Sequence, residues 1–218
     1  MTRRSRLLTT VTAGVTAALL LAGCGGGGGD SKSKNKISGA DRGGSASASP
    51  SASASAATGR PEITFPSDAK NVFEGGKTGD ATKDAVLADS ALSVNSVDEA
   101  IFKGSASTKA LGFYNAGKAL GESITYAQGY INKHDTWVGE TRYFDRSVTL
   151  SGADKAYVTY CSDESKSFIK HKKTNKIENT PTTADSYVLY HTALTKNAAG
   201  VWQTTDVVSN RGAKECQP

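Results

Sequence analysis

The sequence offers few residues that could carry acid–base or nucleophilic chemistry, and their spacing assembles no catalytic motif. His134 precedes Asp135, but adjacent side chains point apart in most backbones, so this pair predicts a surface turn rather than a catalytic dyad. His191 follows Tyr190 in a strand-like segment, which favours a half-buried structural histidine. No nucleophile-elbow, phosphate-loop, dinucleotide-binding, CxxC or HxxxH pattern occurs. We therefore predict no catalytic residue, no metal and no cofactor.

A basic segment without acidic residues lies between positions 166 and 176. It holds Lys166, Lys170, His171, Lys172, Lys173 and Lys176. One interpretation is a solvated loop. The other is a contact of Lys170, Lys172, Lys173 and Lys176 with an anionic polymer or lipid of the cell envelope, which salt would weaken.

The N-terminus has the order of a secretory signal. Three arginines within the first six residues precede an uncharged, mostly apolar run from residue 7 to residue 22, which is too short to span a bilayer comfortably. The run ends in Leu21-Ala22-Gly23-Cys24, which resembles the bacterial lipobox, where small residues precede a cysteine that is lipidated before cleavage. We expect a lipoprotein signal peptide at residues 1–23 and a lipid on Cys24 that holds the protein at the outer face of a bacterial membrane. An ordinary signal peptide with an incidental cysteine is the alternative.

Charge and composition divide the rest of the chain into a tether and a domain. Residues 24–60 are mostly Gly, Ser, Ala and Lys, which predicts a disordered tether with a reach of roughly 35 Å. The first 60 residues hold eight Lys/Arg and two Asp/Glu, so residues 61–218 hold 18 Lys/Arg and 19 Asp/Glu. This nearly neutral region is of single-domain size and lacks the basic surface typical of nucleic-acid binding.

The first half of the domain has helical periodicity. Apolar residues recur at steps of three and four from Val86 to Ile101, with Asp80 and Thr82 as candidate N-caps and a possible restart at Ser96. A second helix is expected from Thr108, its cap, to Lys133.

The second half alternates with a period of two and contains turn signals, which is typical of antiparallel strands. Strands are expected at about 136–144, 146–151, 155–162, 186–196 and 200–209, with an irregular segment over 166–185. Helices followed by strands predict an α+β domain in which N-terminal helices pack on a curved antiparallel sheet.

Several of these features resemble a group of actinobacterial secreted lipoproteins with an NTF2-like (cystatin-like cone) domain. They are two helices before a hairpin-rich sheet, Tyr160-Cys-Ser-Asp-Glu-Ser165 on the middle strand, Gly200-Val-Trp202 in the last hairpin, and a cysteine near the C-terminus. The resemblance implies a Cys161–Cys216 disulfide, a turn shaped by Asp163 and Ser165, and a Trp202 that packs the sheet against a helix.

The cysteine count agrees with that disulfide. Three cysteines minus a lipidated Cys24 leave one pair in an exported, oxidising setting.

NTF2-like cones can hold a pocket between helix and sheet, and several tyrosines could line it. Candidates are Tyr114, Tyr126, Tyr130, Tyr157 and Tyr160, with His191, although aromatic residues at such spacings are also typical of plain core. We predict a tethered domain that binds a small ligand or an envelope protein without catalysis. The alternative is a small-pocket enzyme of the ketosteroid-isomerase-like kind, which a carboxylate or histidine deep in the cone with a perturbed pKa would favour. Protease inhibition lacks a recognisable inhibitory loop.

Replacing Cys24 tests the anchor. In Cys24→Ala the lipid acceptor is gone, so we expect the protein to leave the membrane fraction or to persist as an uncleaved precursor. Metabolic labelling with a fatty-acid analogue checks this, and label retained on the variant would contradict the lipobox prediction.

Overall fold

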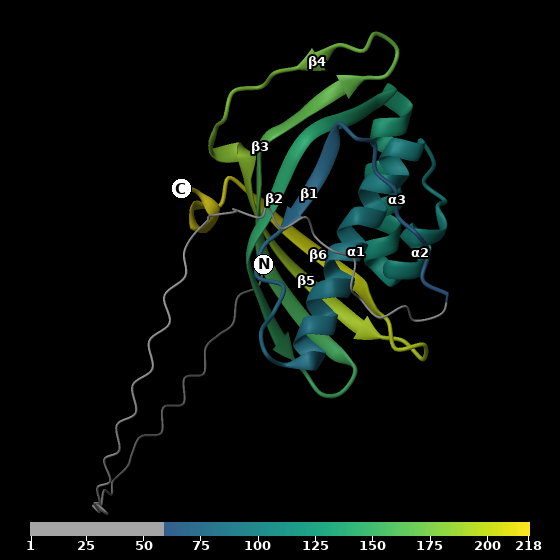
Figure 1. Ribbon diagram of the computed structural model, residues 1–218, viewed down its shortest axis with the longest axis vertical. Coiled ribbons are helices and arrows are strands. Elements are labelled where there is room, and N and C mark those ends of the chain that lie inside the picture. Colours follow the sequence, from purple (N-terminus) through teal and green to yellow (C-terminus); the bar gives the residue numbers. More distant parts are fainter. Residues whose placement is uncertain (1–58) are drawn as a thin grey trace, which may run out of the picture. The chain divides into compact units, whose positions relative to one another are not determined.

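The computed structural model describes residues 59–218 (Figure 1). The predicted signal peptide at residues 1–23, Cys24 and tether residues 25–58 lie outside the described residues and stay predictions. Within residues 59–218, helices pack on one face of a curved, open, mixed sheet, so the predicted α+β class is confirmed. No helix of this part is long and apolar enough to cross a membrane.

The first helix, α1 (Ala81–Lys103), runs without interruption. The Asp80 side chain accepts hydrogen bonds from the backbone of Thr82 and Lys83, as an N-cap does, and Gly104 ends the helix with φ at 64°. The restart suggested at Ser96 does not occur. The Ser96 hydroxyl instead donates to the carbonyl of Ser93 inside the helix, so it satisfies itself locally.

The second predicted helix is two helices, α2 (Lys109–Tyr114) and α3 (Gly117–Lys133). Thr108 caps α2 as predicted. The break follows Asn115, whose buried side chain bonds to Ser93, Ser96 and the Leu111 carbonyl. The backbone N–H of the next residue, Ala116, donates to the carbonyl of Thr204 on a neighbouring strand at 2.9 Å. A tertiary hydrogen bond therefore replaces one turn of helix.

The sheet has the order β1-β2-β3-β5-β6, with the two-residue β4 beside β3. The strands are β1 (Ala69–Phe73), β2 (Asp135–Leu150), β3 (Lys155–His171), β4 (Ile177–Glu178), β5 (Tyr187–Lys196) and β6 (Trp202–Arg211). β1 was not predicted, and it pairs parallel to β2, so the sheet is mixed rather than purely antiparallel. The predicted β5–β6 hairpin is confirmed.

Two irregularities bend the long β2–β3 ladder, and both lie where the sequence suggested ends of strands. The segments 136–144 and 146–151 form one strand, and the register shifts between Phe144 and Ser147, where Asp145 has φ at 49°. The prediction that Asp163 and Ser165 shape a turn leaving the strand is also wrong. Asp163 accepts the Ser165 N–H within a second shift of register, and β3 continues beyond it.

The core lies between the helices and the concave side of the sheet. Trp202 at the start of β6 is 1% exposed and packs with Val86 and Leu87 of α1, as the resemblance implied. The backbone N–H of Trp202 donates to the carboxylate of Asp89, which also pairs with Arg60. Helix α1, the last hairpin and the first described residues are thus joined at one buried carboxylate.

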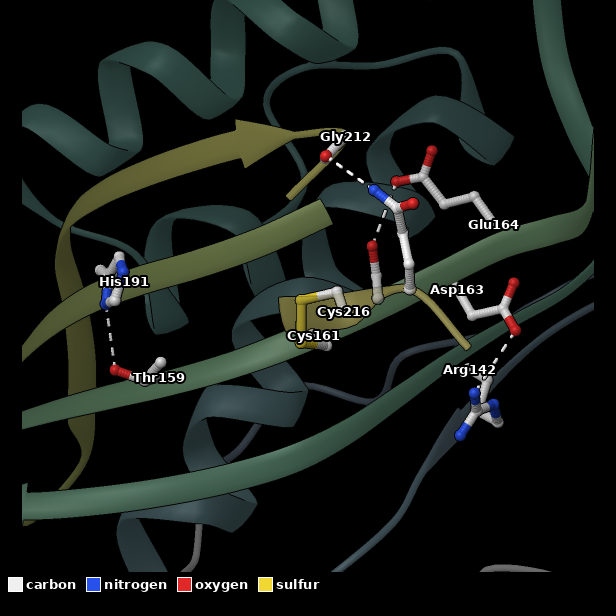
Figure 2. Close-up of a disulfide and its surroundings, with 10 residues drawn as sticks. Arg142, Thr159, Cys161, Asp163, Glu164, His191, Gly212 and Cys216 are labelled. Atoms are coloured by element: carbon white, nitrogen blue, oxygen red, sulfur yellow. Dashed lines mark hydrogen bonds and ion pairs between the residues drawn. A yellow bond between two sulfur atoms is a disulfide. The ribbon is translucent and has the colours of Figure 1, made fainter. Parts of the chain in front are cut away.

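The predicted disulfide between Cys161 and Cys216 is present, with the Cα atoms 5.5 Å apart (Figure 2). Cys161 lies on β3, the middle strand of the sheet, on the side opposite the helices. The chain reaches it by a turn at Gly212, where φ is 78°, and Cys216 is buried among Phe144, Tyr187 and Leu189. The C-terminal segment therefore covers part of the outer sheet face.

Reduction of this bond should destabilise the domain without dissolving its helical core. A loop of 55 residues corresponds to about 4 kcal/mol of lost unfolded-state constraint in the chain-entropy account. We expect Cys161→Ser/Cys216→Ser to lower the melting temperature and to speed hydrogen exchange in residues 212–218. Equal protection of these amides in both proteins would contradict this account.

Candidate functional site

A cavity of about 410 Å³ opens between the helices and the concave face of the sheet. Its walls come from α1, α3 and the four long strands β2, β3, β5 and β6. Because the half-buried acid Asp98 of α1 lies in its wall, we name it the Asp98 cavity. A smaller hollow of about 280 Å³ shares five lining residues with it and extends to residues 180–186; the shared residues are Tyr130, Trp137, Glu164, Ser167 and Arg211.

Two strands hold the Asp98 carboxylate. Asn71 of β1 donates its side-chain N–H to one oxygen at 2.7 Å, and the Trp137 indole of β2 donates to the other at 3.1 Å. Burial raises the pKa of Asp98 to about 7, while the two hydrogen bonds lower it and the charge of Glu164 raises it. The carboxyl therefore changes protonation near neutral pH.

Five tyrosines surround this acid. They are Tyr126 and Tyr130 of α3, Tyr143 of β2, Tyr160 of β3 and Tyr190 of β5. Tyr160 and Tyr190 are cross-strand partners with stacked rings 5.0 Å apart. Burial raises the pKa of the Tyr130, Tyr143, Tyr160 and Tyr190 hydroxyls, so they remain neutral hydrogen-bonding groups at physiological pH. The Tyr126 side chain is 55% exposed.

Four hydroxyls of the cavity wall have no hydrogen-bond partner among residues 59–218. They belong to Ser90, Thr141, Tyr143 and Tyr160, and each of these residues is at most 9% exposed. Each hydroxyl lines the open space of the cavity, where water can reach it. These four can therefore donate to or accept from a molecule in the cavity.

One ion pair forms part of the rim. Arg211 of β6 donates to Glu164 of β3 at 2.8 Å and also to the backbone carbonyl of Asp185 at 2.6 Å. It fixes the junction between the Asp98 cavity and the smaller hollow.

The structure separates the residues predicted to line a pocket. Tyr126, Tyr130 and Tyr160 lie in the cavity wall. Tyr114 does not, which corrects the prediction: it is 1% exposed in the core beneath Phe113 and Arg60. His191 does not line the cavity either, which corrects the prediction that it could.

His191 and Tyr157 lie on the outer face of the sheet. The ring Nδ1 of His191 is 3.1 Å from the Thr159 hydroxyl, on the same side as the disulfide (Figure 2). Its neighbour Tyr190 points inward because successive strand side chains alternate. Tyr157 is 52% exposed.

The other histidines also have structural partners. His134 adopts φ at 58° as the C-cap of α3, and Asp135 pairs with His171 rather than with its neighbour. His171 lies between Asp135 and Glu178, each at 2.7 Å, and these bonds raise its pKa. Within the described part of the chain, no group of three or more His, Cys, Asp or Glu is placed to hold a metal ion.

The lysines of the basic segment fall into two sets. Lys170 pairs with Asp68 at 3.0 Å, and the ammonium of Lys172 donates to the Ile101 and Phe102 carbonyls at the end of α1. Lys173 and Lys176 are exposed. Contact with an anionic envelope component stays a prediction.

Asp98 was missed from the sequence, although a signal was present. Asp98 lies four residues after Val94 and next to Val97, so it borders the predicted apolar stripe of the helix. The sequence instead suggested a restart of the helix at Ser96, two residues before it.

No protein-family model matches this chain, and no curated protein matches its sequence. Solved structures that are similar to it include the following three. A candidate ketosteroid isomerase from Shewanella frigidimarina aligns over 60% of this chain and 98% of its own, with 14% identity and a TM-score of 0.33. A ketosteroid isomerase-like protein from Erwinia carotovora atroseptica aligns over 58% and 93%, with 15% identity and a TM-score of 0.38. The intermembrane space region of chloroplast protein ARC6 aligns over 62% and 99%, with 15% identity and a TM-score of 0.38. At these values nothing about activity is transferred from them.

The raised pKa of Asp98 predicts how stability depends on pH. Between about pH 4 and 7 the folded protein retains a proton that an unfolded aspartate has released, so the free energy of unfolding falls as pH rises through this window. The fall is on the order of 4 kcal/mol at most. Urea unfolding at several pH values should show this fall in the native protein and a flatter profile in Asp98→Asn. The exposed Asp154→Asn is the matched control, and parallel profiles for all three proteins would contradict the assignment.

Proposed function

We propose that this protein is a lipid-anchored, extracytoplasmic binding protein whose domain takes a small molecule into the Asp98 cavity without chemical change. The observation that supports this is the cavity itself. Its volume of about 410 Å³ lies within the range of about 300–1,000 Å³ that small-molecule sites have, and its wall combines aromatic surface with a few polar groups.

The polar groups of the wall favour a ligand site over an imperfectly filled core. A core position gains most from an apolar side chain, whereas Asp98, Tyr143 and Tyr160 bring a carboxyl and two hydroxyls to one space. Their desolvation is offset only when a bound molecule completes their hydrogen bonds. A ligand with an apolar body and a few hydrogen-bonding groups fits this wall.

The anchor gives this binding its expected place. A lipid on Cys24 and a tether of about 36 residues would hold the domain within roughly 35 Å of the outer face of the membrane. The ligand would then be one present in the cell envelope or arriving from outside. The exposed Lys173 and Lys176 would there be within reach of an anionic polymer or lipid of the envelope.

Asp98 favours a second candidate, an enzyme of the ketosteroid-isomerase-like kind. A carboxylate with a pKa of about 7 suits a general base at neutral pH, and neutral tyrosine hydroxyls can stabilise a developing oxyanion. Both oxygens of Asp98, however, already accept hydrogen bonds from Asn71 and Trp137. Binding requires no reacting geometry, and we place it first.

Filling the cavity mouth should abolish binding. Ser123 lines the cavity from α3 and is only partly buried, so Ser123→Trp can occupy the space without disturbing the core. We expect the neutral probe naphthylmethanol to bind the native domain and to bind this variant about tenfold more weakly or worse, measured by calorimetry or ligand-detected NMR. Thr125→Trp, which adds the same side chain at an exposed position of α3, should bind as the native protein does.

The two candidate functions are separated by turnover. Incubation with a β,γ-unsaturated ketosteroid, followed by absorbance of the conjugated product, should show no rate above buffer if the domain only binds. Turnover by the native protein that is lost in Asp98→Asn would replace binding with catalysis. Failure of the native domain to bind naphthylmethanol and also its cationic and anionic analogues, naphthylmethylamine and naphthoate, would overturn the proposed site.

A further inference from the structure

The charged groups that line the Asp98 cavity are unequally compensated. Arg211 and Glu164 neutralise one another at 2.8 Å, and the exposed Glu122 lies 3.6 Å from Lys118. Asp98 has no cationic partner within 4.0 Å among the described residues, and its hydrogen bonds come from the neutral groups of Asn71 and Trp137. Among the charged groups of the cavity wall in the described part of the chain, Asp98 is therefore a carboxylate without a compensating cation.

The walls around this carboxylate also favour positive charge. The faces of aromatic rings carry a negative quadrupole and attract cations within about 6 Å. The charge of Asp98 opposes ionisation of every tyrosine in the wall, which shows that its field extends across the cavity; the tyrosines are Tyr126, Tyr130, Tyr143, Tyr160 and Tyr190. Two sources of negative potential thus meet in one cavity, where charges are screened less than in bulk water.

Hydroxyls of the cavity wall that have no partner in the described part of the chain could add hydrogen bonds to those of the carboxylate. Ser90, Thr141 and Tyr160 are between 4% and 5% exposed, line the cavity and have no partner among residues 59–218. Each hydroxyl oxygen can accept an N–H, and a protonated amine offers up to three such donors with no acceptor. Carboxylate and hydroxyls together match the hydrogen-bonding pattern of an ammonium group.

An anionic ligand finds no equivalent partner in this cavity. The only cationic side chain in the wall is Arg211, whose guanidinium is already bound by Glu164 and by the Asp185 carbonyl. A carboxylate or phosphate entering the cavity would meet Asp98 without compensation, and like charges at short range are strongly unfavourable in such surroundings. The charges of the wall therefore favour cationic ligands over anionic ones.

We infer that the Asp98 cavity selects small organic cations, namely protonated amines with a flat apolar body, whose ammonium group binds Asp98 while the body lies against the tyrosine rings. This inference rests on the proposed function, because it names the ligand class of the same cavity. It adds charge selectivity, which simple burial of an apolar molecule would not produce.

Three probes that share one ring system test the inference. Naphthylmethylamine, naphthylmethanol and naphthoate present a cation, a neutral alcohol and an anion of similar size. At about pH 8, where Asp98 is ionised and the amine is still largely protonated, we expect calorimetry to show the amine binding at least about tenfold more tightly than the alcohol. Naphthoate should bind more weakly than either.

Two further measurements assign the selectivity to Asp98. Asp98→Asn should reduce amine affinity about tenfold and change alcohol affinity less than about twofold, whereas Asp154→Asn, at an exposed position outside the cavity, should change neither. Should Asp98→Asn not fold, the native protein serves, since lowering the pH to about 5.5 should weaken the amine and leave the alcohol unchanged.

The titratable and charged groups that line the cavity beside Asp98 come from several elements of the fold, apart from the neutral donors Asn71 and Trp137. They are Tyr143 on β2, Tyr160 and Glu164 on β3, Tyr190 on β5, Arg211 on β6, and Glu122, Tyr126 and Tyr130 on α3. None is a histidine, so a loss of amine binding near neutral pH reports a carboxyl, and its disappearance in Asp98→Asn assigns that carboxyl to Asp98.

The outcomes separate the two levels of the proposal. Equal affinity for amine and alcohol, or selectivity that survives Asp98→Asn at about pH 8, overturns the cation inference and leaves the binding function standing. Absence of binding by all three probes overturns both.

Discussion

Two interruptions in the β2–β3 ladder bend the sheet, and the cavity exists because of that bend. The shifts of register after Glu140 and after Phe144 insert one extra residue into each strand in turn, which increases local twist and bends the strands. At Gly139 the backbones approach so closely that a Cβ would lie 2.0 Å from the Lys166 carbonyl oxygen. With φ at 99°, this position also requires glycine. A flat sheet would meet α1 and α3 directly and would leave no space around Asp98.

The placement of Asp98 reflects a balance between burial and hydrogen bonding. Moving a carboxylate out of water is costly, and here two neutral donors, Asn71 and Trp137, offset part of that cost. The remainder appears as a pKa raised to about 7. An apolar side chain at this position of α1 would give a more stable core. An acid at this position offsets that loss of stability where it interacts with a bound molecule.

The outer face of the sheet has a different role. There the disulfide holds the C-terminal segment over Phe144 and Leu189, while His191 and Tyr157 remain in contact with solvent. Cys161 and its neighbour Tyr160 point to opposite faces of β3. Tyr160 faces the cavity, and Cys161 forms the disulfide on the outer face. The middle strand thus contributes to covalent stabilisation on one side and to the candidate site on the other.

Local patterns in the sequence determined the helices, the last hairpin and, with the family resemblance, the disulfide. These features depend on capping residues, apolar periodicity and turn signals within a few residues, as at Asp80, Thr108 and Asn197-Ala-Ala-Gly200. Only the tertiary structure decided β1, the division at Asn115 and the convergence of Asp98 with the tyrosines, because these depend on partners far apart in the chain. Alternation along β5 implied that Tyr190 and His191 face opposite ways, but packing of α1 and α3 on one side of the sheet decided which of the two faces the cavity.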